Sequence, residues 1–217
     1  MPRDDFSHVT HWVFDLDNTL YPASDLYDEI GGRMTDYIAR TLALDMAAAL
    51  EVRERYFYQY GATVVGLARH HGIDAHDFLN DVHQADHSVL TPDADLRALI
   101  EALPGQRVIF TNGGGGHAER VLKSLKLDDL FHAVFDIEAA ALTPKPQPAC
   151  YERLIETLDI NPRRALLIED TLRNLEPAHE LGFETALVGG VHPEPWPAYV
   201  DHYAHSATEL LRQLTRR

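Results

Sequence analysis

The stretch Trp12-Val13-Phe14-Asp15-Leu16-Asp17-Asn18-Thr19 is the part of the sequence from which the fold is best predicted. Three apolar residues come first, and acidic and polar residues follow at once. A short apolar run of this kind is typical of a strand buried on both faces of a parallel sheet. Four further runs share this character: Val108–Phe110, Ala133–Phe135, Ala165–Ile168 and Thr185–Val188.

Helical patterns alternate with these runs. Apolar residues recur at i, i+3, i+4 and i+7 within residues 96–103, 118–125, 151–158 and 207–214. Strands that alternate with helices indicate parallel βαβ units with helices on both faces of the sheet. The predicted fold is therefore α/β, with a Rossmann-like three-layer core around a parallel central sheet.

Residues 20–92 differ from the rest of the chain because they contain no convincing strand pattern. Helical patterns cover residues 26–38, 47–60, 63–71 and 75–84. We expect an inserted all-helical cap domain over residues 20–92, and a core formed by residues 1–19 and 93–217. Long insertions after the carboxyl end of a strand commonly serve the site at that end.

The composition narrows the class of protein. The chain has 217 residues, of which 45% are hydrophobic and 24% charged, as in a globular domain. The net charge of −15 disfavours nucleic acid polymers and anionic membranes as partners. Met1–Thr10 lacks the features of a secretory signal, and no apolar run approaches the roughly 18 residues of a membrane span. We therefore expect a cytoplasmic protein, either a monomer or a homodimer.

Cysteine and histidine give little sign of a metal cage. Cys150 is the single cysteine, so no disulfide forms within the chain, and we expect it to be a packing residue. The thirteen histidines are scattered without an HExxH pattern, and we expect most of them at the surface.

Polar residues follow three of the predicted strands. Asp15 and Asp17 follow the first, Thr111-Asn112-Gly113 the second, and Glu169-Asp170 the fourth. Lys145 lies between two prolines, just before a predicted helix. Because parallel strands end on one edge, where ligands bind, we expect these side chains to converge there.

This set of residues suits attack on a phosphate. Asp15 can act as a covalent nucleophile, and Asp17 can give a proton to the leaving group and later take one from water. A Mg²⁺ held by Asp15 and Asp170 would neutralise the charge of the nucleophile and phosphate. Thr111, Asn112, Gly113 and the following helix N-terminus would hold phosphate oxygens, with Lys145 directed at the phosphate and at Asp15.

Each feature taken alone has a simpler explanation. An Asp-x-Asp segment is often a solvated turn, and Asp170 can merely cap a helix. A glycine run can be a flexible loop, and Lys145 can lie in a surface turn. Their joint occurrence at strand ends, in this order, favours a phosphate site.

At this point the sequence resembles the haloacid dehalogenase superfamily. Its four motifs are matched by Asp15-Leu16-Asp17-Asn18-Thr19, Thr111-Asn112, Lys145-Pro146 and Glu169-Asp170 with Asn174. The resemblance implies Asp15 as nucleophile, Asp17 as acid and base, Thr111 and Lys145 on the phosphate, and Mg²⁺ bound by Asp15, Asp170 and the Asp17 backbone carbonyl. Dehalogenating members lack the second aspartate, so Asp17 favours phosphoryl chemistry.

A closer likeness, to the pyrimidine 5′-nucleotidase branch, extends through the predicted cap. It rests on segments that include Leu20-Tyr21-Pro22, Tyr60-Gly61-Ala62-Thr63, His71-Gly72-Ile73-Asp74 and His117-Ala118. The branch implies release of phosphate from nucleoside monophosphates such as UMP or CMP. Arg33, Tyr60 and Thr63 are the cap residues that we expect to contact the leaving group.

Two alternatives remain open at this stage. A phosphosugar phosphatase or phosphomutase would share the first chemical steps and differ in the cap and in the fate of the phosphoryl group. A non-catalytic, phosphate-binding regulatory protein would keep the fold alone, because a fold does not specify an activity.

Overall fold

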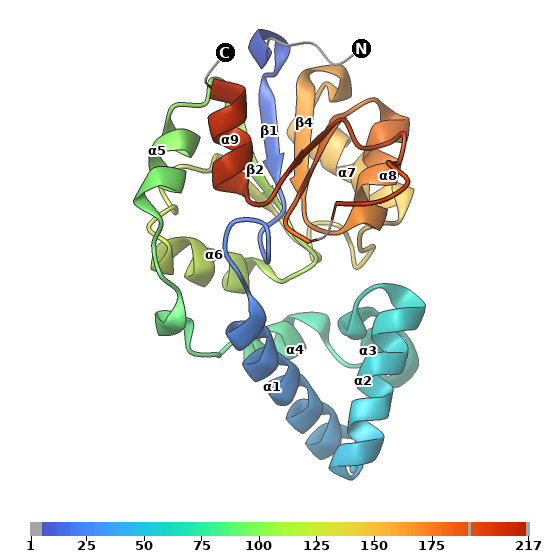
Figure 1. The fold of residues 1–217 in the computed structure, drawn as a ribbon. Coiled ribbons are helices and arrows are strands. Elements are labelled where there is room, and N and C mark those ends of the chain that lie inside the picture. The colour runs from blue at the N-terminus through green and yellow to red at the C-terminus, as the bar shows by residue number, and fades with distance from the viewer. Residues whose placement is uncertain (1–5, 191, 216–217) are drawn as a thin grey trace.

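A six-stranded parallel sheet forms the centre of the molecule in the computed structural model, which describes residues 6–190 and 192–215 (Figure 1). The strand order is β3-β2-β1-β4-β5-β6. The strands are β1 (His11–Phe14), β2 (Gln106–Phe110), β3 (Ala133–Phe135), β4 (Ala165–Glu169), β5 (Glu184–Val188) and β6 (His202–Ala204). The five predicted strands are confirmed, and β6 is an additional short strand at one edge.

Strand β1 lies between β2 and β4, which decides where the site forms. Phe14 pairs with Ile109 of β2 and with Ile168 of β4. The three strands therefore end side by side, and the polar residues after them reach the same edge. This register explains why the polar residues that follow these strands converge at one edge, as the sequence predicts.

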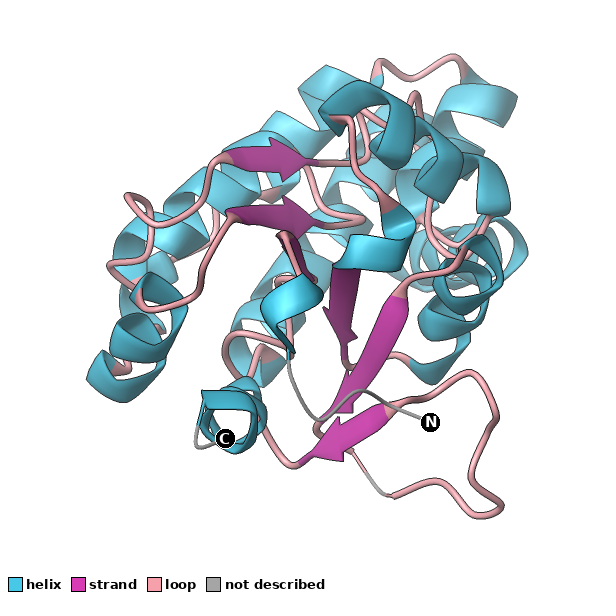
Figure 2. Cartoon of the chain, turned by 90° about the horizontal axis from the view of Figure 1, so that it is seen from above, coloured by secondary structure: helices cyan, strands magenta, loops and turns pink. Residues whose placement is uncertain are grey.

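Helices cover both faces of the sheet (Figure 2). Trp12 and Phe14 share one apolar cluster with residues of α5 (Ala94–Glu101), α6 (Gly115–Ser124) and α9 (Ala207–Thr215). Val13 points to the opposite face and shares a second cluster with residues of α7 (Pro148–Leu158) and α8 (Leu172–Leu181). This alternation along β1 is the period of two that a strand imposes on its side chains.

Four helices between β1 and α5 form the cap, which lies beyond the carboxyl ends of the strands (Figure 1). They are α1 (Ser24–Leu42), α2 (Met46–Tyr60), α3 (Thr63–His71) and α4 (Ala75–Val82), followed by the 3₁₀ helix η2 (His87–Val89). The predicted α/β fold with an all-helical insertion is confirmed. The limits of the two domains stay a prediction. Residues 1–5 and 216–217, at the two ends of the predicted core, lie outside the described residues.

The cap has an apolar core of its own. Tyr56 of α2 and Leu67 of α3 belong to it, together with Phe78 of α4. A Cβ atom at Gly66 would lie 2.2 Å from Cγ of Tyr56, so the absence of a side chain there lets α2 and α3 pack closely. Asp45 and Asp74 cap the N-termini of α2 and α4 through hydrogen bonds from backbone amides.

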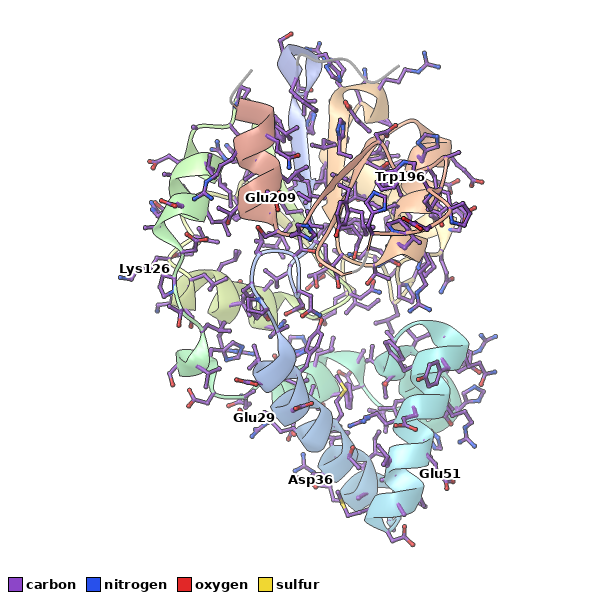
Figure 3. All side chains as sticks on the ribbon, viewed as in Figure 1. Glu29, Asp36, Glu51, Lys126, Trp196 and Glu209 are labelled. Carbon is purple, nitrogen blue, oxygen red and sulfur yellow. The ribbon has the colours of Figure 1, made fainter. Side chains whose placement is uncertain are left out.

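Acidic side chains project outward from the cap. Glu29, Asp36 and Glu51 of the cap are exposed, and so is Trp196 on the core side (Figure 3). An anionic substrate therefore needs positive charge at the site itself. None of the described helices combines the length and apolar composition that crossing a bilayer requires.

Candidate active site

Asp15 directly follows β1 and is almost completely buried. Its backbone amide donates to the carbonyl of Ile168 at 2.9 Å, and its side chain is 6% exposed. Thr19 Oγ1 donates to Asp15 Oδ2 at 2.8 Å. The chain turns between them at Asn18, whose φ of 64° is one that asparagine tolerates better than most residues. The turn brings Thr19 back onto Asp15.

Lys145 lies at the centre of the site, 1% exposed. Its Nζ donates to Asp15 Oδ1 at 2.7 Å, to Glu169 Oε2 at 2.7 Å and to the carbonyl of Phe110 at 2.8 Å. Burial acts to lower the pKa of Lys145, but the two carboxylates more than offset this and raise the pKa above its ordinary value. The ammonium group is therefore charged.

Asn112 fixes the backbone of Lys145. Its Oδ1 accepts from the Lys145 amide at 2.8 Å, and its Nδ2 donates to the Lys145 carbonyl at 3.1 Å. Both ends of this side chain are thus occupied within the protein. The Asn112 side chain is therefore suited to positioning Lys145, and the expected contact of Asn112 with phosphate stays a prediction.

Carboxylates outnumber the ammonium group at this point. Asp15, Glu169 and Asp170 each offer an oxygen, and these oxygens lie within 4.8 Å of one another. Burial, followed by the proximity of Glu169, raises the pKa of Asp15 to about 7. Burial, followed by the proximity of Asp15, also raises the pKa of Asp170.

Excess negative charge in a cluster of carboxylate oxygens fits a hard cation such as Mg²⁺. Glu169 already binds Lys145 and accepts from the backbone amide of Thr171 at 3.1 Å. Asp15 and Asp170 are therefore the better placed ligands of the three.

Thr111 and Gly113 form the part of the edge that follows β2. Thr111 is 3% exposed, and its Oγ1 accepts from the Gly113 amide at 2.9 Å. Helix α6 begins at Gly115, directly after this segment. Its first-turn amides are therefore close to the site.

Asp17 has surroundings of a different kind. It is 8% exposed, and its Oδ1 is held by His117 Nε2 at 2.8 Å and by the hydroxyl of Tyr21. Burial acts to raise the pKa of Asp17, but His117 and the hydrogen bond from Tyr21 outweigh it and lower the pKa below its ordinary value. The two aspartates therefore titrate differently, although they are two residues apart.

Most histidines are exposed or partly exposed, as expected from the sequence. Three of them, His83, His87 and His117, are instead buried near Asp17. The spacing held a signal, since His117 precedes the buried Val121 by four residues and so shares its helix face. Cys150 is buried as expected, and burial raises the pKa of its thiol to about 12.

A cavity of about 500 Å³ separates this edge from the cap. Residues of the core that line it include Asp15, Asp17, Thr111, Asn112, Gly113, His117, Lys145, Glu169 and Asp170. Cap residues that line the other side include Tyr27, Met34, Arg53, Phe57, Tyr58, Thr63 and Phe78.

Thr63 is the one predicted cap residue among those that line the cavity. Arg33 instead donates to the carbonyl of Asp81 at 3.3 Å, and Tyr60 is hydrogen-bonded to His70. Four other cap residues of the lining were not predicted from the sequence: Tyr27, Arg53, Phe57 and Tyr58. Helical spacing identifies the faces of α1 and α2, but not which face meets the core.

Comparison with known proteins agrees with this geometry. The model of the haloacid dehalogenase-like hydrolases matches residues 10–182. The (S)-2-haloacid dehalogenase of Xanthobacter autotrophicus is 27% identical over 84% of this chain and 76% of its own. Phosphate metabolism protein 8 of Saccharomyces cerevisiae is 31% identical over 57% of this chain, which corresponds to 42% of the yeast protein.

A solved structure has the same fold. The haloacid dehalogenase (HAD) phosphatase from Thermococcus onnurineus superposes with a TM-score of 0.68 at 18% identity, covering 95% of this chain and 98% of that one. The fold and the acidic edge define an α/β hydrolase. The chain belongs to the haloacid dehalogenase-like hydrolases, because their model matches most of its length.

Proposed function

We propose that this chain is a Mg²⁺-dependent phosphomonoester hydrolase that works through an aspartyl-phosphate on Asp15. The contrast between the two buried aspartates carries the proposal. Asp15 is held by Lys145 beside an acidic pair, whereas Asp17 is held by His117 and Tyr21. One position suits a nucleophile with a cation next to it, and the other suits a proton donor and acceptor. Because the pKa of Asp17 is lowered in the free protein, Asp17 has to take up a proton together with the anionic substrate before the first step.

The reaction has two balanced steps. An oxygen of Asp15 forms a bond to phosphorus while the bond from phosphorus to the leaving oxygen breaks, and Asp17 gives its proton to that oxygen. Water then attacks the same phosphorus, the bond to Asp15 breaks, and Asp17 takes a proton from the water. Free Asp15, protonated Asp17 and inorganic phosphate result.

Asp15, Asp170 and the Asp17 backbone carbonyl would hold the Mg²⁺. When bound, it supplies positive charge against the phosphate oxygens. Lys145 neutralises Asp15 from the protein side, and Thr111 with the amides near Gly113 offers donors to the phosphate. The protein thus supplies charge and orientation from side chains that are already in place.

For the substrate, we infer a small phosphorylated metabolite, with a pyrimidine nucleoside 5′-monophosphate as the first candidate. The cavity volume lies in the range typical of small-molecule sites. Tyr27, Phe57 and Tyr58 offer rings on which a planar base can stack. A sugar phosphate would use the same core residues and fewer of these rings.

The similarity to a 2-haloacid dehalogenase supports a second candidate function. Carbon–halogen cleavage would use Asp15 as nucleophile on carbon, and halide leaves without needing a proton. Asp17 and its two hydrogen-bond donors would then have no chemical task. Their presence favours the phosphatase.

The test is phosphate release with Mg²⁺ across a panel of nucleoside and sugar monophosphates, with chloride release from 2-chloropropionate measured in parallel. We expect phosphate release from at least one monophosphate, and its loss in excess chelator. Asp15→Asn should reduce the rate by at least about 10⁴-fold, as for loss of other covalent nucleophiles. Asp36→Asn, at an exposed position of α1, is the matched control and should retain full activity.

Activity that survives in Asp15→Asn, or chloride release without phosphate release, would overturn the proposal. Binding of phosphate without turnover of any compound would favour a regulatory protein.

A further inference from the structure

Three buried histidines lie behind Asp17, and we name them the histidine cluster: His83, His87 and His117. They are 4%, 7% and 1% exposed. His87 Nε2 lies 3.3 Å from His117 Nδ1, and the ring of His83 stacks on that of His117 at 4.7 Å between centroids. This burial and mutual contact distinguish the cluster from the exposed histidines of the cap.

Hydrogen bonding fixes the direction of these rings. His87 Nδ1 lies 2.7 Å from the carbonyl of Ala85, which accepts only, so this nitrogen carries a hydrogen. In the neutral ring, Nε2 of His87 is then an acceptor and receives the Nδ1 hydrogen of His117. The opposite nitrogen of His117, Nε2, lies 2.8 Å from Asp17 Oδ1 and donates to it, so His117 uses both ring nitrogens as donors.

Both connections between core and cap take part in this arrangement. Tyr21, which also binds Asp17 Oδ1, lies on the outgoing connection between β1 and α1. His83 and His87 lie on the return connection, at the end of α4 and in η2. Asp17 therefore contacts the outgoing connection directly through Tyr21 and the return connection only indirectly, through His117.

These contacts all involve one oxygen of Asp17. Oδ1 has two partners, and among residues 6–190 and 192–215 no hydrogen bond engages Oδ2. Asp17 also lines the cavity. A carboxylate held by one oxygen presents its other oxygen in a fixed direction.

We propose that His117 is a positioning residue that fixes Asp17 through Oδ1, with His87 and His83 holding the His117 ring, so that Oδ2 faces the leaving oxygen of the substrate. The inference rests on the proposed function and concerns its proton-transfer step alone. His117 touches neither Asp15 nor Lys145 in any described hydrogen bond, so nucleophilic attack is not its task.

The experiment compares a poor and a good leaving group. The alkoxide of glycerol 3-phosphate needs a proton to depart, whereas p-nitrophenolate does not. His117→Leu should lower the single-turnover rate of leaving-group release from glycerol 3-phosphate by about 100-fold, the lower end of the range for acid–base catalysis, and from p-nitrophenyl phosphate by less than about fivefold. Single-turnover measurement isolates the first step, because Asp17 acts on water in the second step with both substrates. KM should stay within about twofold for both, since phosphate binding is unaffected.

Conservative replacement provides the second readout. His117→Gln keeps a nitrogen donor at the depth of Nε2 and should restore most of the lost discrimination between leaving groups. His87→Leu leaves His117 in place and should give a weaker loss with the same dependence on leaving group. If His117→Leu does not fold, these two variants decide the question. His76→Leu, at an exposed histidine of α4, is the matched control.

Asp17→Asn separates failure of the inference from failure of the proposed function. Equal losses on both substrates in His117→Leu, or no loss, would overturn the positioning role if Asp17→Asn still discriminates between leaving groups. An Asp17→Asn variant that is fully active on glycerol 3-phosphate would overturn the acid–base mechanism itself.

Discussion

The two walls of the cavity are built in opposite ways. On the core wall, Asp15, Lys145 and Glu169 are each less than 10% exposed and linked by hydrogen bonds of 2.7 Å. On the cap wall, Tyr27 and Phe57 are 44% and 45% exposed, and Tyr58 is 78% exposed. The core wall is organised before any ligand binds, whereas the aromatic rings of the cap wall gain further contacts only with a ligand.

We therefore expect substitutions on the two walls to have different effects. Changes on the core wall should affect stability and the rate of the chemical step, because its groups are buried and mutually dependent. Changes on the cap wall should affect substrate preference and leave folding intact.

Lys145→Met gives the largest effect expected from this comparison. The variant leaves the carboxylates of Asp15 and Glu169 buried without their ammonium partner, and we expect a loss of about 3–5 kcal/mol in the free energy of unfolding. Urea denaturation at neutral pH measures it. Lys123→Met, at an exposed position of α6, should change stability by less than about 0.5 kcal/mol. A similar small change in Lys145→Met would show that the core wall is not mutually dependent.

His83, at the junction of the two walls, gives an intermediate effect that depends on pH. Burial, followed by the proximity of His117, lowers the pKa of His83 to about 3. An unfolded histidine has a pKa of about 6.5, so below that pH the unfolded chain binds a proton that the folded chain does not. Stability should therefore fall as pH decreases from 6.5, by up to about 1.4 kcal/mol per pH unit from this group.

His83→Phe should remove this contribution while keeping a ring against His117. Between pH 6.5 and pH 5, the wild type should lose about 2 kcal/mol more unfolding free energy than the variant. Urea denaturation at the two pH values measures the difference. Parallel losses in both proteins would mean that His83 is not buried in its neutral form.

Phe57→Ala, on the cap wall, gives the smallest effect. We expect KM for the preferred nucleoside monophosphate to rise up to about tenfold through lost stacking, with kcat changed less than about twofold. KM for p-nitrophenyl phosphate, measured in the same preparation, should respond differently from that for the nucleotide. Tyr58→Ala is a useful companion, since the two rings are neighbours. A fall in kcat with constant KM in Phe57→Ala would contradict the separate roles of the two walls, because the cap wall would then affect the chemical step.

The parts of the molecule that the sequence predicts best are those where a reactive side chain directly follows an apolar strand. Asp15, Thr111 and Glu169 each follow a buried apolar run, so the parallel sheet brings them to one edge. Strand β6 was missed because His202-Tyr203-Ala204 is short and partly polar, and pairing with β5 alone defines it.

Other features depend on contacts between distant segments. His117 meets Asp17 across 100 positions of sequence, and the cap rings face the cavity only because of how α1 and α2 are mounted on the core. The nucleotide specificity, the roles of the site residues, Mg²⁺ binding, the cytoplasmic location and the oligomeric state stay predictions.

The central place of β1 has a consequence for the dynamics of the protein. Local opening of a sheet begins at its edges, here β3 and β6, and the central strands exchange their amide hydrogens last. The amide of Asp15 is bonded to Ile168 within those central strands. Opening of either edge strand therefore leaves Asp15 and Asp17 in place. Catalytic activity should persist until the sheet as a whole unfolds.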